Sequence, residues 1–303
     1  MLRATRLMLA MLLLALVSAC GGQPAGLLAS RPAATAVPAT TSARAETTAT
    51  TPAKGLTVFA AASLTDAFKE IATAFGKAND NATVTFNFAG SDQLAQQIIQ
   101  GAPADVLASA NKKQMDVAIQ AGDIISGTAR TFVRNRLVVV YPKDNPGKLQ
   151  TLKDLAKPGL KLVLANKNVP VGAYALDFLD KASKLPEYSA TYRESVLKNV
   201  VSYEENVRAV LSKVTLGEAD AGIVYTTDAA TVKDARIGTL AIPDTLNTIA
   251  TYPIAATKNA KHGDLAKKFV DYVLSPDGQK ILAKYGFIPT NGSAAGAAQT
   301  AAP

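Results

Sequence analysis

Hydrophobic and polar positions divide the chain into two kinds of segment. Short runs rich in β-branched and aromatic residues predict strands, and stretches with an apolar side chain every three or four positions predict amphipathic helices. A predicted helix follows most of the strands, and this alternation predicts an α/β fold with ligands at the carboxyl ends of the strands. The predicted strands are Leu56–Ala60, Thr83–Phe88, Asp105–Ser109, Leu137–Tyr141, Lys161–Ala165, Val200–Tyr203, Ala221–Tyr225 and Tyr252–Thr257.

The most informative segment runs from Leu56 to Phe68. Its strand ends in three alanines, and an amphipathic helix is predicted to start at Ser63. Ser63 and Asp66 have the spacing of a capping box, in which the serine hydroxyl accepts a backbone N–H of the first helical turn. Small residues before a helix leave its first N–H groups and the positive end of its dipole accessible, so we expect an anion at this turn.

Three other predicted strand-to-helix turns have the same design. Ser91 follows Ala89-Gly90 and is placed to cap a helix, Val171 follows Pro170 at the start of another, and Asn206 is placed to cap a helix beginning at Val207. One such turn alone is an ordinary structural cap, but four of them after four strands indicate a shared site. Tyr225 adds a phenolic hydroxyl at the end of a further strand.

Both ends of the chain differ in composition from the rest. Residues 1–19 combine Arg3 and Arg6 with an apolar run and small residues, which is typical of a secretory signal peptide. Cys20, the only cysteine, follows at once and predicts a lipid-modified N-terminus; the alternative is an ordinary secretory signal with an incidental thiol. Residues 20–55 and 291–303 contain few large apolar side chains, so we expect a disordered linker and a disordered tail.

Composition excludes several classes of function. The formal net charge is +8, but the lysines are scattered and few aromatic residues lie among them, so nucleic-acid binding is not expected. A single histidine, His262, and a single cysteine cannot supply a zinc cluster or a Ser-His-Asp triad. The sequence also has no phosphate-binding loop and no GxGxxG motif. We therefore expect neither an enzyme nor a cofactor.

Five separated motifs resemble the periplasmic molybdate-binding proteins of molybdate ABC transporters. The similar region covers about residues 55–289, and the motifs are VFAAASL at 58–64, GAPADV at 101–106, VPVGAYA at 169–175, ENVR at 205–208 and GIVY at 222–225. The resemblance implies that molybdate and tungstate are the ligands. It also implies that the molybdenum arrives as an oxyanion bound by the hydroxyls and amides of Ser63 and Ser91, the amides of Val171 and Val207, and the hydroxyl of Tyr225.

The resemblance also implies a fold and a set of partners. The fold is that of a two-lobed, type II periplasmic binding protein, in which each lobe is a mixed sheet flanked by helices and the ligand lies in the cleft between the lobes. We expect residues 56–137 and 254–290 in lobe one and residues 138–253 in lobe two. The expected partners are the membrane permease and the ATPase of an importer, with the chain a monomer, outside the cytoplasm, and anchored to the membrane by its N-terminal lipid.

The sequence departs from the family pattern at three places and leaves alternatives open. Gly90-Ser91-Asp92 replaces a more serine-rich run, which leaves Ser91 as the hydroxyl expected at the ligand. Val171 stands where alanine is common, and Asn206 stands where aspartate is often found. The turn motifs place no Arg or Lys at the ligand, so neutral donors and helix dipoles would hold a dianion. The alternatives are a receptor for another oxyanion or for iron(III)–carbonate, a secreted α/β enzyme that uses Glu204 or Glu205 as its base, and a sensor or scaffolding lipoprotein.

Overall fold

The structure is a computed structural model that describes residues 55–233 and 236–290. The predicted signal segment, Cys20, the linker up to Lys54 and the tail from residue 291 lie outside the described residues. Every helix in the described ranges is too short or too polar to cross a membrane.

The first of two mixed sheets has six strands in the order β11–β4–β10–β3–β1–β2. The strand β1 lies parallel to β2 and β3, whereas β10 pairs antiparallel with β3 and β4, and β11 pairs antiparallel with β4. The first sheet is therefore parallel on one side and antiparallel on the other. Its strands are β1 Gly55–Ala61, β2 Thr83–Ala89, β3 Val106–Ala108, β4 Arg130–Asn135, β10 Ala250–Ala256 and β11 Ile288–Pro289.

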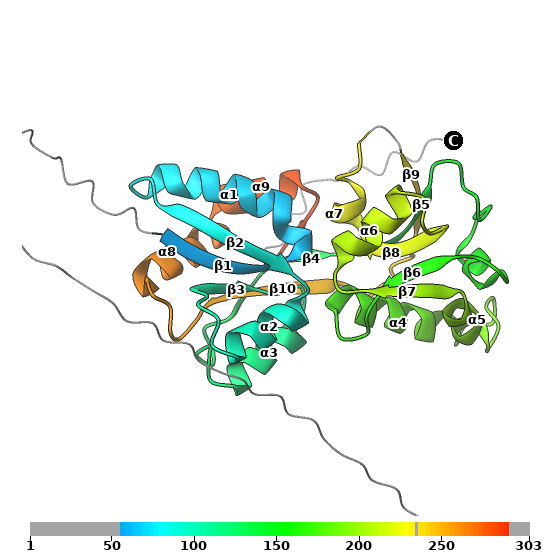
Figure 1. Cartoon of the computed structure of the whole chain (residues 1–303), viewed down its shortest axis with the longest axis horizontal. Coiled ribbons are helices and arrows are strands. Elements are labelled where there is room, and N and C mark those ends of the chain that lie inside the picture. Colours follow the sequence, from blue (N-terminus) through cyan, green and yellow to red (C-terminus); the bar gives the residue numbers. More distant parts are fainter. Residues whose placement is uncertain (1–54, 234–235, 291–303) are drawn as a thin grey trace, which may run out of the picture. The chain divides into compact units, whose positions relative to one another are not determined.

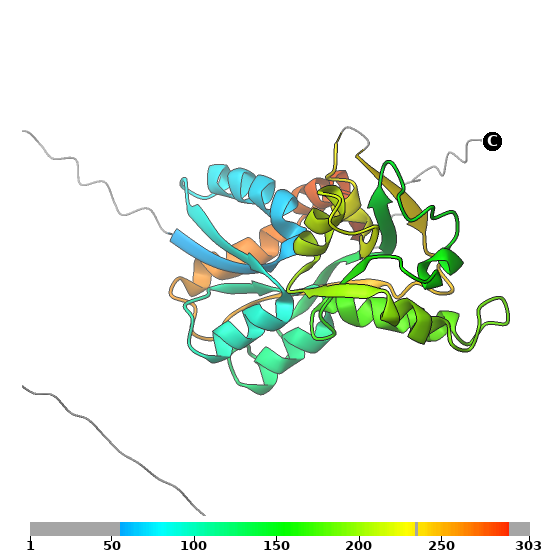
Figure 2. The ribbon, with the colours of Figure 1, turned by 45° about the vertical axis from the view of Figure 1, so that its right-hand side comes forward.

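Helices cover both faces of the first sheet (Figure 1). On one side lie α1, α8 and α9, and on the other lie α2 and α3, which stay together in the turned view (Figure 2). The apolar face of α1 is buried because Phe68 packs against the rings of Phe132 and Phe269 at centroid distances of 5.8 and 6.0 Å. The helical segments are η1 Ala62–Leu64, α1 Thr65–Ala78, α2 Ser91–Ile99, α3 Lys112–Gln120, α8 Gly263–Leu274 and α9 Pro276–Lys284.

The second sheet has five strands in the order β7–β6–β8–β5–β9. Here β6 is parallel to β7 and β8, and β5 is antiparallel to β8 and β9. Helices α6 and α7 lie on one side of it and α4 and α5 on the other (Figure 1). The elements are β5 Leu137–Pro142, β6 Leu162–Ala165, β7 Val200–Glu204, β8 Ala221–Tyr225, β9 Ile237–Ala241, η2 Leu152–Ala156, α4 Pro170–Ala182, α5 Tyr192–Lys198, α6 Val207–Thr215 and α7 Thr226–Ala229.

The chain passes between the sheets twice. It leaves the first sheet after Asn135 and enters the second at Leu137, and it returns between Ala241 and Ala250. Both passages come earlier than the expected lobe boundaries: Leu137, expected in lobe one, pairs with Tyr225 in the second sheet. Residues 250–253, expected in lobe two, belong to β10 of the first sheet. The boundary was misplaced because a buried strand has the same apolar pattern whichever sheet it joins.

The predicted class of fold, two mixed sheets flanked by helices, is confirmed. Three strands escaped the sequence pattern, namely β4, β9 and β11. The strand β4 reads Arg-Thr-Phe-Val-Arg-Asn, and its two arginines interrupt the apolar run although Phe132 and Val133 are buried. The strand β11 has only two residues, which is too short for any periodicity to show.

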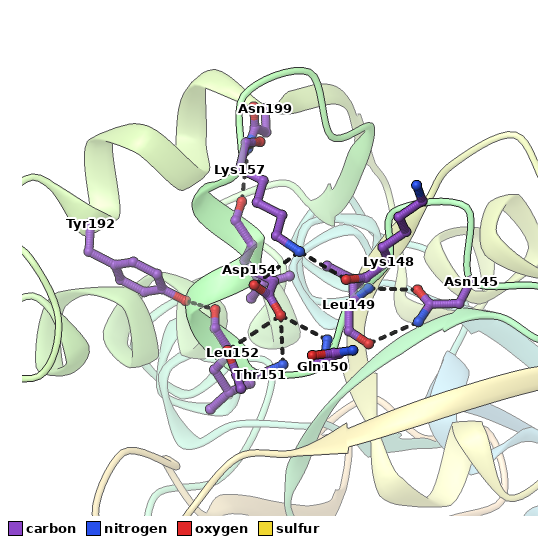
Figure 3. A network of polar contacts seen from close by, with 11 residues as sticks. Asn145, Lys148, Leu149, Gln150, Thr151, Leu152, Asp154, Lys157, Tyr192 and Asn199 are labelled. Atoms are coloured by element: carbon purple, nitrogen blue, oxygen red, sulfur yellow. Dashed lines mark hydrogen bonds and ion pairs between the residues drawn. The ribbon is translucent and has the colours of Figure 1, made fainter.

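A network of polar contacts fixes the turn that leads into η2 (Figure 3). The carboxylate of Asp154 accepts the backbone N–H groups of Gln150 and Thr151, each at 2.8 Å, and lies 3.1 Å from the Lys157 ammonium. The Tyr192 hydroxyl donates to a backbone carbonyl of the same turn. Burial alone would raise the pKa of Asp154, but the two N–H groups and Lys157 outweigh it and lower the pKa to about 2.

We expect Asp154→Ala to lower the free energy of unfolding by about 1–2 kcal/mol at neutral pH, because two backbone donors lose their acceptor. A lowered pKa in the folded state means that the stabilisation is present above the unfolded-state pKa, near 4, and disappears as the pH falls towards 2. Urea unfolding at pH 7 and at pH 3 measures this. Asp144→Ala, at an exposed acid in the preceding turn, is the control. Equal losses for the two variants would contradict the assignment.

Candidate functional site

One cavity is lined by all five site residues that the sequence predicts. The other lining residues come mostly from strand-to-helix turns of the two sheets. The space open to the centre of a water-sized sphere is about 10 Å³, on the order of what one water molecule needs. The cavity is therefore compact and much smaller than the sites of organic ligands. Its lining consists of Ala61, Ala62, Ser63, Ala89, Gly90, Ser91, Ala110, Val169, Pro170, Val171, Asn206, Val207 and Tyr225.

Helix starts surround the cavity on several sides. The helices α2, α4 and α6 begin at Ser91, Pro170 and Val207, and the 3₁₀ turn η1 contains Ser63. The first N–H groups of a helix have no partner within the helix, and the helix dipole adds partial positive charge there. The backbone amides of Val171 and Val207 belong to such first turns. The cavity is thus bordered by backbone donors and by the positive ends of several helix dipoles.

The serines do not cap their helices, contrary to the capping interpretation of the sequence. Neither η1 nor α1 has a side-chain cap, and the N-cap position of α2 is Gly90. Only Asn206 acts as predicted, accepting the N–H of Ala209 at 3.0 Å. Small preceding residues let the backbone turn without a side-chain cap, so both serine hydroxyls are available for other contacts.

Each serine oxygen instead forms a hydrogen bond with a group from a distant segment of the chain. The Ser91 Oγ accepts the backbone N–H of Ala110 at 2.9 Å. Since a backbone N–H can only donate, the Ser91 hydroxyl keeps its own hydrogen for a ligand. The Ser63 Oγ lies 2.9 Å from the Tyr252 hydroxyl. Both serines are buried.

The Tyr225 hydroxyl is the strongest sign of a missing partner at this site. Tyr225 is 1 % exposed, and its hydroxyl has no hydrogen-bond partner among the described residues. Burial raises the pKa of Tyr225 well above its ordinary value, and Tyr252 and Tyr174 nearby raise it further. The phenol therefore stays protonated and has a donor to offer to the cavity. A buried hydroxyl without a partner costs about 1–3 kcal/mol, which a ligand acceptor would remove.

Charged side chains are absent from the described lining of the cavity. The nearest cation in the motifs, Arg208, turns away: its Nε lies 2.6 Å from Asp228 and its Nη2 lies 2.8 Å from Asp66. The acids Glu204 and Glu205, the possible bases of an enzyme, do not line the cavity either. Glu205 accepts a hydrogen bond from Gln93 at 3.4 Å. The described lining can hold an anion with neutral donors and places no carboxylate or imidazole against it.

Sequence reasoning missed three residues that support the site. The sequence marks Gly90 only as a small residue and Tyr252 only as part of a predicted strand, and no local pattern marks the backbone of Ala110. Tyr252 is fully buried and contacts Ser63 across 189 positions of sequence. The only signal in the chain is a tyrosine within an otherwise apolar strand, because a buried hydroxyl requires a partner.

The sequence is similar to a family of known proteins. A family model described as bacterial extracellular solute-binding protein matches residues 56–288. The molybdate-binding protein ModA of Mycobacterium tuberculosis is 37% identical over 78% of this chain and 85% of its own. The corresponding protein of Escherichia coli is 35% identical, over 77% of this chain and 88% of its own. The sequence similarity thus spans both sheets.

Solved structures show the same fold. The periplasmic molybdate-binding protein of Azotobacter vinelandii aligns with a TM-score of 0.65 at 22% identity, covering 77% of this chain and 98% of the other. At that identity the comparison bears on the fold alone. It agrees with the two mixed sheets flanked by helices.

Proposed function

We propose that this chain, which belongs to the bacterial extracellular solute-binding proteins, captures molybdate outside the cytoplasm for an ABC importer. The observation that carries the proposal is the cavity lined by Ser63, Ser91, Val171, Val207 and Tyr225, which offers neutral donors and no charge. The relatives named molybdate-binding proteins, at 35–37% identity, support the choice of ligand.

Neutral donors are sufficient to bind a dianion in such a cavity. Each hydrogen bond to a charged acceptor contributes roughly 1.5–3 kcal/mol. Five to seven of them, at the upper end of that range, exceed the cost of association and leave about −8 kcal/mol or better, which is micromolar affinity or tighter. Tungstate has the same charge and shape as molybdate and is included in the proposal. No cofactor and no catalytic step belong to it.

The remaining parts of the proposal concern location and partners. Signal segment and Cys20 support a lipoprotein anchored to the membrane, and the importer's permease and ATPase are the proposed partners of the monomer. Detergent phase separation of a cell extract tests the lipid anchor at Cys20. The wild-type protein should partition into the detergent phase, and the Cys20→Ala variant should not.

Isothermal titration of residues 55–303 with molybdate, tungstate, sulfate and phosphate tests the ligand. We expect micromolar or tighter binding of molybdate and tungstate, weaker binding of sulfate and no binding of phosphate. Tight binding of sulfate alone would contradict the molybdate proposal and favour the alternative that the chain is a receptor for another oxyanion, namely sulfate. A coloured protein that carries iron would favour the iron(III)–carbonate alternative, although the described residues contain no cluster of three or more His, Cys, Asp or Glu side chains.

Tyr225→Phe separates binding from folding. Removing the hydroxyl should weaken molybdate binding at least roughly tenfold, the low end for a hydrogen bond to a charged acceptor. The same change should leave the ligand-free protein as stable as the wild type or up to about 1 kcal/mol more stable, because the hydroxyl lacks a partner there. Titration and urea unfolding measure the two effects. A loss of stability without a loss of affinity would remove Tyr225 from the site.

A further inference from the structure

A chain of buried polar groups leads from the passage between the sheets to the cavity. Asn135 is the last residue of β4, and the chain enters the second sheet two residues later. Asn135, Tyr252 and Ser63 are each at most 3 % exposed. Hydrogen bonds join Asn135 to Tyr252 and Tyr252 to Ser63. Side chains so buried have no water to choose their hydrogen-bond direction, so the direction is set by the groups themselves.

The backbone fixes the direction at the start of this chain. The N–H of Arg136 can only donate, and it donates to the Asn135 Oδ1 at 2.9 Å. The other end of the amide, Nδ2, can only donate, and it faces the Thr227 Oγ1 at 2.8 Å and the Tyr252 hydroxyl at 3.4 Å. The hydrogen of Tyr252 therefore points away from Asn135, and the acceptor within hydrogen-bond distance of it in the described part of the chain is the Ser63 Oγ, at 2.9 Å.

We propose that Tyr252, oriented by Asn135, is a positioning residue that fixes the Ser63 hydroxyl as a donor to the ligand and thereby excludes protonated oxyanions. The Ser63 oxygen accepts from Tyr252, so its own hydrogen is directed to the cavity. Ser91 is fixed in the same sense by the backbone N–H of Ala110. The inference rests on the proposed function, because it concerns the selectivity of an oxyanion site.

The selectivity for ligands follows from whether each donor of the site meets an acceptor oxygen on the anion. Molybdate, tungstate and sulfate carry only acceptor oxygens at neutral pH, so every fixed donor finds an acceptor. Phosphate keeps at least one proton, and its O–H would meet a donor instead of an acceptor, leaving a buried polar group unsatisfied. Without the Tyr252 hydroxyl, the Ser63 hydroxyl can rotate and accept the proton of hydrogen phosphate.

Tyr252→Phe tests the relay by titration with molybdate, sulfate and phosphate at mildly alkaline pH, where phosphate is a dianion like sulfate. We expect molybdate and sulfate to bind roughly threefold to tenfold more weakly and the preference for sulfate over phosphate to narrow by roughly tenfold. In a Ser63→Ala background, Tyr252→Phe should change molybdate affinity less than about twofold, because the group through which it acts is gone.

The controls separate the relay from a general loss of structure. Tyr192→Phe removes another buried hydroxyl, at the start of α5, which donates to the Leu152 carbonyl of η2, and should leave all anion affinities unchanged. Weaker binding by Tyr252→Phe with an unchanged sulfate-to-phosphate preference would overturn the relay, since a structural role predicts that result. A wild type that binds no oxyanion would overturn the proposed function and the relay together.

Asn135→Asp provides a second, independent variant should Tyr252→Phe fail to fold. The carboxylate can keep the Arg136 contact, but its second oxygen accepts where Nδ2 donated. The Tyr252 hydroxyl then donates to residue 135, and the Ser63 hydroxyl donates to Tyr252 instead of the cavity. The buried charge repels sulfate and hydrogen phosphate alike, so it cancels in the ratio of the two affinities. A change in that ratio therefore reports the reversed direction of the Ser63 hydroxyl. A ratio shifted towards phosphate supports the relay, and an unchanged ratio overturns it.

Discussion

Gly90→Ala should weaken molybdate binding at least a hundredfold while leaving the ligand-free protein folded. A Cβ at Gly90 would lie 2.5 Å from the backbone carbonyl oxygen of Glu205. Gly90 precedes α2 at the first sheet, and Glu205 precedes α6 at the second, so the overlap occurs where the two sets of turns meet. A backbone oxygen cannot move aside as a flexible side chain would.

The size of the effect follows from the number of donors that separate. Moving these turns apart withdraws Ser63 and Ser91 from Val171, Val207 and Tyr225, so at least two hydrogen bonds to the anion are lost. At roughly 1.5–3 kcal/mol each, the loss is at least about 3 kcal/mol, or more than a hundredfold in affinity. Titration with molybdate measures the affinity, and urea unfolding without ligand measures the stability.

Gly263→Ala is the matched control, because a Cβ there meets nothing within 4 Å. It should leave affinity and stability unchanged within error. If Gly90→Ala bound molybdate like the wild type, the contact between Gly90 and Glu205 would not be required in the ligand-bound protein.

The turns that line the cavity could be predicted from sequence because their signals are local, whereas the choice of the five residues as ligands comes from the family resemblance. Ser63, Ser91, Val171 and Val207 each lie where a strand gives way to a helix, and Tyr225 ends a strand. Strand, small residues and helix start are all visible within about ten positions of each other. The rule that strand ends gather at one edge of a sheet groups the turns within each sheet, and the resemblance to a two-lobed binding protein supplies the expectation that the two groups meet.

The roles within the site could not be predicted, because they depend on contacts between distant segments. The serines looked like helix caps, and only the Ala110 and Tyr252 partners show that they are not. The passage between the sheets was misplaced for the same reason: Leu137 has the apolar neighbours of a buried strand but nothing in its own segment names Tyr225 as its partner. The local sequence pattern predicts that a strand is present, but only its pairing with a distant strand determines which sheet it joins.

Arg208 is the clearest case of a residue whose role only the structure reveals, and removing its charge should have the largest effect on stability. Its guanidinium bridges Asp66 on α1 and Asp228 on α7, which belong to different sheets. Asp228 is fully buried; Arg208 contacts its Oδ1, and its Oδ2 has no hydrogen-bond partner among the described residues. Arg208→Met keeps the apolar stem but leaves a buried carboxylate unpaired, which costs about 3–5 kcal/mol.

The loss should depend on pH in a defined direction. Burial raises the pKa of Asp228 to about 6, although Arg208 acts to lower it. A carboxyl whose folded-state pKa lies above its unfolded value opposes folding once it ionises, so its contribution falls as the pH rises through that pKa. Without Arg208 the pKa rises further. Urea unfolding should therefore show a larger difference between wild type and Arg208→Met at pH 8 than at pH 5.

Two further variants determine whether the buried charge is the cause. Arg136→Ala breaks an exposed ion pair with Asp244 and should cost less than about 1 kcal/mol. Adding Asp228→Asn to Arg208→Met removes the unpaired carboxylate and should recover most of the lost stability at pH 8. If the double variant were as unstable as Arg208→Met and the pH difference were absent, the packing of the arginine stem, rather than its pairing with Asp228, would hold α6 in place.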